Sequence, residues 1–183
     1  MFNLNDFQSI YIYQYGKVGS STLQCTFKKY HDNVIHTHQY DEKMMSKKTL
    51  IINVVRNLYD RNISAFFHNI NNYKHGLFYY CPHTDNENIK IDNLINFFRN
   101  CNIRHLNEKI APWFKNFNDK FNINIFSKEF DNKKKYNIYN TSGPIILTLR
   151  FEDINDWENI LSNIFNIKIE LHAKNITEKK KNC

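Results

Sequence analysis

The segment Gly16–Thr22, which reads GKVGSST, combines glycine, hydroxyl and cationic side chains in an order that suits the binding of a phosphate group. Backbone N–H groups of such a loop can converge on an anion with the N-terminus of a following helix, and Gly19 lets the backbone approach it closely. The order is not that of a Walker A loop, GxxxxGK[ST], because Lys17 precedes the second glycine. We expect a phosphate-binding loop of another kind, and an ordinary glycine turn with a serine cap is the alternative. The residues predicted to contact the phosphate are Lys17, Val18, Gly19, Ser20, Ser21 and Thr22.

A second phosphate-binding segment is predicted at Val55–Ser64, which reads VRNLYDRNIS. Arg56 follows a run of β-branched residues, and ligands of open α/β sheets bind at the carboxyl ends of the strands. Ser64 lies eight residues later, about two helical turns along, so both side chains reach one phosphate only if the chain folds back over it. The alternative is a surface ion network of Arg56 and Arg61 with Asp60.

Two histidines are candidates for a general base. Ile35–Gln39 reads IHTHQ, and the alternation of a strand places His36 and His38 on the same face. Histidine titrates near neutral pH and therefore suits proton transfer. The alternatives are histidines without a catalytic role, a base among Asp41, Glu42 and His68, or a metal site, for which a third ligand is lacking.

The predicted elements bring these segments to one edge of a sheet. Strands are expected at Ser9–Tyr15, Asn33–His38 and Thr49–Val55, each followed by a helix: one ending near His31, one at Asp41–Lys48 and one at Asn57–Tyr73. This order predicts the α/β class, with a P-loop-like parallel sheet flanked by helices on both faces. Further helices are expected at Ile91–Phe98, Ile110–Phe117 and Asp153–Ile164, and further strands at Asn122–Ser127 and Ile145–Arg150.

Length and composition limit the function classes. The 183 residues suffice for one domain, and a net charge of +7 favours a polyanionic partner without choosing among nucleic acid, phosphorylated cofactors, acidic glycans and membrane surfaces. The four cysteines are widely spaced and include no CxxC pair, so neither a disulfide framework nor a zinc cluster is expected. No signal-peptide pattern and no apolar run of about 20 residues is present. We expect a cytoplasmic protein without a membrane span.

Taken together, the two phosphate segments resemble the 5′-phosphosulfate and 3′-phosphate elements of sulfotransferases that use 3′-phosphoadenosine-5′-phosphosulfate (PAPS). The stretch VVRNLYDRNISAFF is similar to R-D-P-x-x-R-x-x-S-A-[FY] of carbohydrate sulfotransferases, although Asn57 and Leu58 replace the usual Asp-Pro. The stretch ILTLRFEDINDW is similar to the late motif L-R-[FLY]-E-D-[LI]. In order and spacing, nearly the whole chain resembles the bacterial-type group of capsular polysaccharide synthesis proteins, which is a branch of the sulfotransferase superfamily.

The resemblance implies an enzyme that moves the sulfuryl group of PAPS to an acceptor hydroxyl, with a glycan favoured by the resemblance alone. Lys17 would neutralise the leaving phosphate, the loop with Ser20, Ser21 and Thr22 would hold the 5′-phosphate, and Arg56 with Ser64 would hold the 3′-phosphate. Some glycan 2-O-sulfotransferases carry a similar H-x-H with the second histidine as base, which puts His38 first and His36 second. No metal is implied.

Other functions stay open at this stage. They are a nucleotide kinase or NTPase, a basic nucleic-acid-binding module, and a sulfotransferase-like protein without activity. No nucleic-acid motif is present and the basic residues are dispersed, so a nucleic-acid partner is not expected. Glu152 and Asp153 are interpreted as a helix start, with Asp153 as N-cap and Arg150 pairing nearby. Residues 1–183 are expected to form a single domain that lacks its C-terminal helix, because 173–183 resembles the entry to such a helix.

Overall fold

The computed structural model divides the chain into two compact units. The first unit comprises Met1–Asn57 and Asn118–Cys183, and the second comprises Leu58–Phe117. The residues described are 1–69, 95–96, 98–100, 109–127 and 129–172. All the predicted phosphate ligands except Ser64 belong to the first unit.

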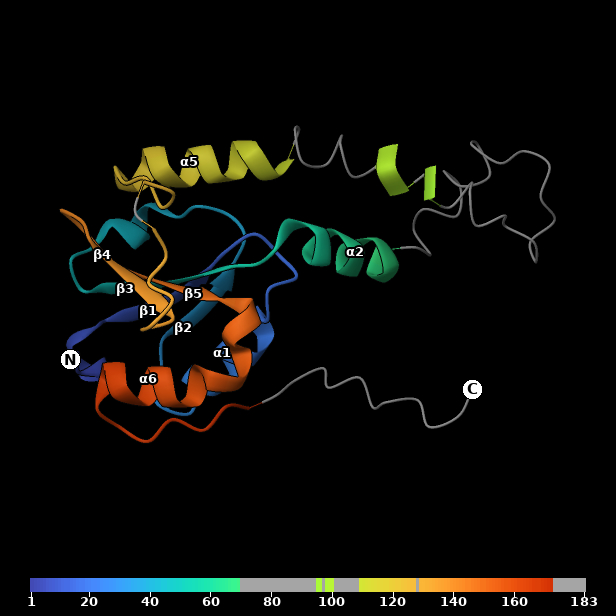
Figure 1. Ribbon diagram of the computed structural model, residues 1–183. Helices are drawn as coiled ribbons and strands as arrows, with labels where there is room; N and C mark the ends of the chain where they lie inside the picture. Colours follow the sequence, from blue (N-terminus) through green and yellow to red (C-terminus); the bar gives the residue numbers. More distant parts are fainter. Residues whose placement is uncertain (70–94, 97, 101–108, 128, 173–183) are drawn as a thin grey trace, which may run out of the picture. The chain divides into compact units, whose positions relative to one another are not determined.

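The first unit is built on a five-stranded mixed sheet of order β2-β1-β3-β5-β4 (Figure 1). Strands β2, β1, β3 and β5 are parallel, whereas β4 runs antiparallel to β5. The prediction of a parallel sheet was therefore wrong at this edge: a short turn joins β4 to β5, and a turn of a few residues joins only antiparallel strands. The strands are β1 (Ser9–Tyr13), β2 (Val34–Thr37), β3 (Thr49–Val55), β4 (Tyr136–Asn140) and β5 (Ile145–Arg150).

Helices α1 (Ser20–Phe27) and α6 (Trp157–Phe165) cover one face of this sheet (Figure 1). Alternate strand residues supply the apolar core beneath them, as expected for a buried strand face. Phe27 packs edge-on against Phe165 with ring centroids 5.7 Å apart, which joins the two helices. The core side chains of the strands on this face are Ile10, Ile12, Val34, Leu50, Ile52, Val54, Leu147 and Leu149. On the other face, Tyr13 contacts Phe121.

The second unit holds α2 (Leu58–Asn69) and most of α5 (Ala111–Phe121), whose last residues belong to the first unit. Trp113 stacks on Phe117 with ring centroids 5.3 Å apart. Both helices were predicted, but the predicted extension of α2 to Tyr73 and most of the helix predicted at Ile91–Phe98 lie outside the described residues. None of the described helices is long and apolar enough to cross a membrane.

Three predicted elements differ in the structure. Asn122–Ser127 is a series of turns rather than a strand, because Asn122 is left-handed (φ 48°) and Ser127 N donates back to the Asn124 carbonyl. The helix predicted at Asp41–Lys48 is only the 3₁₀ turn η2 (Glu42–Met45). The helix predicted from Asp153 begins later, because the 3₁₀ segment η4 (Phe151–Asp156) precedes α6. A further 3₁₀ turn, η1 (Leu4–Asp6), precedes β1.

Candidate functional site

The loop between β1 and α1 has the backbone conformation of an anion-binding nest. Lys17 (φ 70°) and Gly19 (φ 80°) are both left-handed, and Val18 between them is not. Such an alternation turns successive N–H groups to one side. Gly19 is the N-cap of α1 and has no side chain to bond the first-turn N–H groups. A left-handed residue other than glycine costs on the order of 1–3 kcal/mol, and the buried Val18 side chain helps to hold the loop in place.

Arg56, at the end of β3, contacts this loop directly. Its Nη1 donates to the Lys17 carbonyl over 2.9 Å, so the two segments predicted from the sequence meet at one edge of the sheet. The Arg56 Nε is buried and has no hydrogen-bond partner in the described part of the chain. Ser64 lies in α2, in the second unit, and its predicted role stays a prediction. Arg61, also in α2, donates to Asn62 Oδ1 over 2.8 Å.

Phe151 and Glu152, directly after β5, contact both predicted segments. A Cβ added at Gly19 would lie 3.2 Å from the Phe151 ring, and the Arg56 Cζ lies 4.2 Å from the centroid of the same ring. Glu152 Oε1 accepts a hydrogen bond of 2.7 Å from Asn57 N. The sequence analysis gave these two residues no part in the site. The available signal was that Phe151 follows a strand expected to end at the same edge as β1 and β3.

The two histidines lie together beside the loop and are organised by Gln14. His38 Nδ1 bonds to the Gln14 carbonyl over 2.8 Å, and the Gln14 side-chain nitrogen lies 3.3 Å from His36 Nε2. The imidazole centroids are 5.0 Å apart, and a Cβ at Gly16 would lie 3.7 Å from His38 Cε1. Burial, and next the neighbouring His38, lower the pKa of His36. His36 therefore favours its neutral form.

The contact with Gln14 fixes the tautomer of His38. A carbonyl oxygen can only accept, so Nδ1 carries the hydrogen, and a neutral ring then keeps its lone pair on Nε2. The side chain of His38 is exposed. The acceptor nitrogen of the neutral ring is therefore Nε2. Gln14, whose type and position drew no attention in the sequence, is the residue that orients both histidines.

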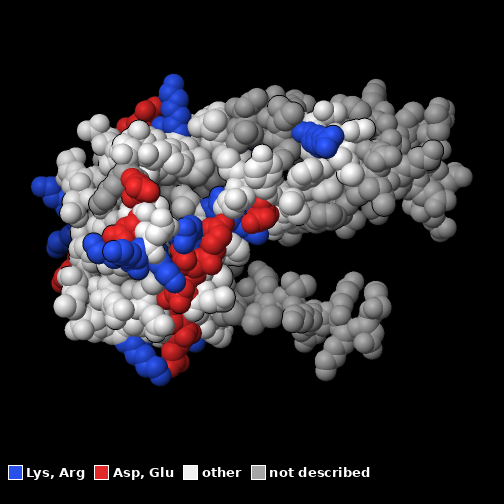
Figure 2. All heavy atoms as spheres, in the orientation of Figure 1, with Lys and Arg blue, Asp and Glu red and all other residues white. Residues whose placement is uncertain are grey.

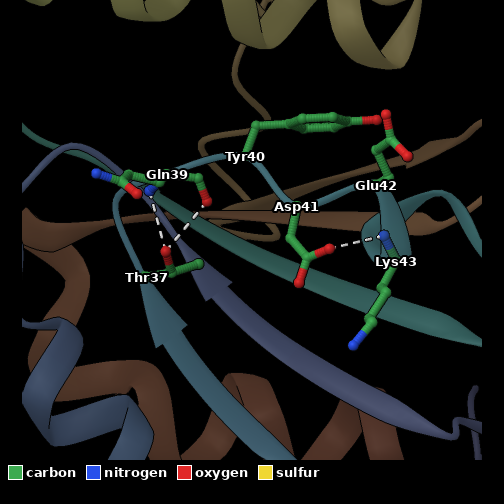
Figure 3. Close-up of a pocket in the computed structure, with 6 residues that line it drawn as sticks. All are labelled: Thr37, Gln39, Tyr40, Asp41, Glu42 and Lys43. Atoms are coloured by element: carbon green, nitrogen blue, oxygen red, sulfur yellow. Dashed lines mark hydrogen bonds between the residues drawn. The ribbon is translucent and has the colours of Figure 1, made fainter.

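An open pocket of about 550 Å³ lies at the carboxyl end of β2 (Figure 3). Thr37 accepts from Gln39 N and donates to the Gln39 carbonyl, while Asp41 accepts from Lys43 N. The Tyr40 ring has Lys120 Nζ 4.9 Å from its centroid. The lining is thus polar with one aromatic side chain. Its residues are Thr37, Gln39, Tyr40, Asp41, Glu42 and Lys43.

The carboxylates of the Arg150–Asp153 stretch have structural partners. Asp153 pairs with Arg150 through bonds of 2.7 and 3.0 Å, which confirms the predicted ion pair. The predicted N-cap was wrong, because Asp156 occupies that position in α6 and makes no side-chain cap. Asp153 lies inside the 3₁₀ segment, where its carboxylate bonds to the Arg150 guanidinium instead of capping a helix. Asp153 through these contacts, and Glu152 through its bond to Asn57 N, stabilise the turn that follows β5.

Metal ligation finds no support in the described part of the chain, where no group of three or more His, Cys, Asp or Glu side chains could hold an ion. The chain matches no family model, no curated protein and no solved structure. The geometry of the site and the sequence motifs therefore carry the functional argument.

Proposed function

We propose that this chain is a PAPS-dependent sulfotransferase with a sulfotransferase-type α/β fold, which transfers a sulfuryl group to an acceptor hydroxyl, with a glycan as the favoured acceptor. The observation that carries the proposal is the contact between Arg56 Nη1 and the Lys17 carbonyl, 2.9 Å long. It brings together two cationic segments that resemble the two phosphate-binding elements of that family. A nucleotide with phosphates at both its 3′ and 5′ positions needs two such elements side by side.

The residues present fit such a nucleotide. The left-handed Lys17 and Gly19 shape a nest for the 5′-phosphate. The hydroxyl-bearing residues Ser20, Ser21 and Thr22 form the first turn of α1, directly after the nest. Among the residues that the structure describes, the buried Arg56 Nε has no hydrogen-bond partner. A buried donor without an acceptor costs free energy, which a phosphate oxygen near the guanidinium would recover.

PAPS, when bound, supplies a sulfuryl group, and its transfer develops negative charge on the 5′-phosphate. Lys17 would stabilise that charge, since its ammonium belongs to the loop that holds the phosphate. His38 Nε2 would take the proton of the acceptor hydroxyl, because the Gln14 carbonyl keeps the ring hydrogen on Nδ1. His36 would stay neutral beside it, which avoids a second positive charge 5.0 Å away.

The pocket at the end of β2 is the proposed approach for the acceptor. Thr37, Gln39 and Asp41 offer hydrogen-bonding groups, and Tyr40 offers an aromatic ring, which together suit a hydroxyl-rich molecule (Figure 3). Thr37 and Gln39 line the pocket whereas His38 between them does not. An acceptor bound in the pocket would therefore have to extend past the end of β2 for its hydroxyl to reach His38.

A ligand titration tests the proposal against its competitors. The purified chain is titrated by calorimetry with adenosine 3′,5′-bisphosphate, adenosine 5′-phosphate, ATP and duplex DNA. We expect the bisphosphate to bind tightest, because it alone engages both elements. Tighter binding of ATP would favour a kinase or NTPase, and tighter binding of DNA would favour a nucleic-acid-binding module. Labelled PAPS with a panel of oligosaccharides then identifies the acceptor.

A further inference from the structure

One aromatic ring touches both elements of the proposed phosphate site. Its edge faces Gly19: a Cβ there would lie 3.2 Å from Phe151 Cε2 and 3.3 Å from Cδ2. Its face carries the Arg56 guanidinium, with Cζ 4.2 Å from the centroid. Gly19 and Arg56 are far apart in the sequence. The Phe151 ring is therefore in contact with both the loop and the arginine.

The Phe151 ring is fixed in position by its contact with Trp157. It packs edge-on against Trp157, with centroids 6.4 Å apart, and Trp157 is fully buried. Trp157 Nε1 donates to the Arg150 carbonyl over 3.1 Å, and Glu152 next to the ring accepts from Asn57 N over 2.7 Å. The corner after β5 is therefore tied to α6 on one side and to the end of β3 on the other.

Arg56 has little else to hold it. Among the residues described it forms no ion pair, and its one hydrogen bond within the chain goes from Nη1 to the Lys17 carbonyl. An arginine side chain has several rotatable bonds, and fixing them costs rotamer entropy. Stacking on a ring removes much of that freedom before a ligand arrives, since the planar guanidinium lies over the aromatic face.

We propose that Phe151 is a positioning residue, which fixes the spacing between the Gly16–Thr22 loop and Arg56 so that one ligand with two phosphates can reach both. This inference rests on the proposed function for the identity of the ligand. A bisphosphate nucleotide is bivalent, and its advantage over a monophosphate depends on both sites being held at the matching distance. A monophosphate uses one site and is indifferent to the spacing.

The test compares four variants. Phe151→Ala removes the ring, Phe151→Leu keeps bulk near Gly19 but offers no π face, and Phe151→Tyr keeps the ring. Phe130→Ala is the matched control, because Phe130 lies under a different guanidinium, that of Arg150, at 5.1 Å. Two readouts are taken: calorimetric affinity for adenosine 3′,5′-bisphosphate and for adenosine 5′-phosphate, and hydrogen exchange of the amides of residues 16–22 without ligand.

We expect Phe151→Ala to lower bisphosphate affinity roughly ten- to a hundredfold and monophosphate affinity less than about threefold. Phe151→Leu should lower bisphosphate affinity about three- to tenfold, and Phe151→Tyr should bind the bisphosphate as tightly as the unmodified chain does. Loop amides should exchange faster in Phe151→Ala and stay unchanged in Phe130→Ala. A circular-dichroism melt of each variant identifies those that have lost the fold.

Equal losses for both nucleotides, or loop exchange unchanged in Phe151→Ala, would overturn the positioning role. If Phe151→Ala fails to fold, the Leu and Tyr variants decide: equal bisphosphate affinity for both contradicts the inference. If the unmodified chain binds no bisphosphate, the proposed function fails. Faster loop exchange in Phe151→Leu than in Phe151→Tyr would still support the positioning of the loop by the ring.

Discussion

Two lysines in this chain share an uncommon backbone conformation, the left-handed one, but differ in the groups that contact them. Lys17 (φ 70°) lies in the loop after β1, and Lys135 (φ 63°) lies in the turn before β4. Lys135 N donates to the Asp131 carbonyl and its ammonium pairs with Asp156 at 2.6 Å. A contact at Lys17 involves its backbone: Arg56 Nη1 donates to the Lys17 carbonyl. An ion pair holds the turn before β4, whereas a hydrogen bond from Arg56 holds the loop after β1.

The difference lies in which groups meet: the loop after β1 meets a guanidinium, whereas the lysine of the turn before β4 meets a carboxylate. Around Lys135, Lys134 also pairs with a carboxylate, that of Asp131, at 3.5 Å, although an open hollow of about 350 Å³ lies beside both lysines. On the face seen in Figure 2, a band of red side chains runs down the described surface with blue side chains beside it. The loop after β1 combines a nest-like backbone with a guanidinium in contact, so it is the better place for a phosphate.

The largest expected effect concerns His38. Replacing it with alanine should lower turnover by roughly 10²–10⁴-fold, the usual loss for a general base, while the affinity for adenosine 3′,5′-bisphosphate stays unchanged. The measurement is sulfuryl transfer from labelled PAPS beside calorimetry. Full activity in the variant would pass the role of base to His36 or to a carboxylate. His31→Ala is the matched control, because His31 lies away from the loop, where its Nε2 bonds to the Phe7 carbonyl.

Arg56→Ala comes next. Loss of a charge-assisted phosphate contact should weaken bisphosphate binding by about 2–4 kcal/mol. Adenosine 5′-phosphate should lose less, but not nothing, because Arg56 also holds the Lys17 carbonyl and so shapes the loop. Calorimetry with both nucleotides separates the two effects. Equal losses for the two nucleotides would show that Arg56 only stabilises the loop and does not contact the 3′-phosphate. The difference between the Lys17 loop and the Lys135 turn would then be a difference in structure alone and not in ligand binding.

Much of the first unit could be predicted from the sequence. Thr49–Val55 and Ile145–Arg150 are nearly continuous apolar runs, and both are strands with the predicted bounds. The glycine-rich segment after the first strand gave the loop and the start of α1. Local patterns suffice here because strand and loop are determined by residues that are neighbours in sequence. The missed strand β4, YNIYN, is short and polar, and it forms because the edge of β5 is available to pair with it.

The site could be predicted only in part, because its decisive contacts are long-range. The sequence placed Lys17, Arg56 and the histidines at one edge, since consecutive parallel strands end there. It could not show that Arg56 would bond to the loop carbonyl or that Phe151 would lie between Gly19 and the guanidinium. These contacts depend on how β5 enters the sheet, about 90 residues after β3.

A smaller effect is expected from the half-buried His36 at low pH. The pKa of His36 is lowered in the folded chain, so the unfolded chain binds its proton first as the pH falls. The stabilisation is fully present above the ordinary pKa of about 6.5, and it is lost as the pH falls through the lowered value. His36→Gln cannot take up the proton. Urea unfolding at about pH 7.5 and about pH 5.5 should show a smaller loss of stability in the variant than in the unmodified chain. Equal losses would show that other groups cause the acid sensitivity.

The smallest effect should come from Lys135, and this prediction is the sharpest check on the comparison. Lys135→Ala removes the ion pair with Asp156 and keeps a side chain in the left-handed region, whereas Lys135→Gly removes the pair and relieves the backbone. An exposed ion pair contributes little, so the melting temperature should fall slightly for alanine and less, or not at all, for glycine. Bisphosphate affinity should stay within about twofold in both variants, because the turn binds no phosphate. A loss like that of Arg56→Ala would mean that the turn before β4 also contacts the nucleotide, and that its ion pairs open when a stronger anion arrives.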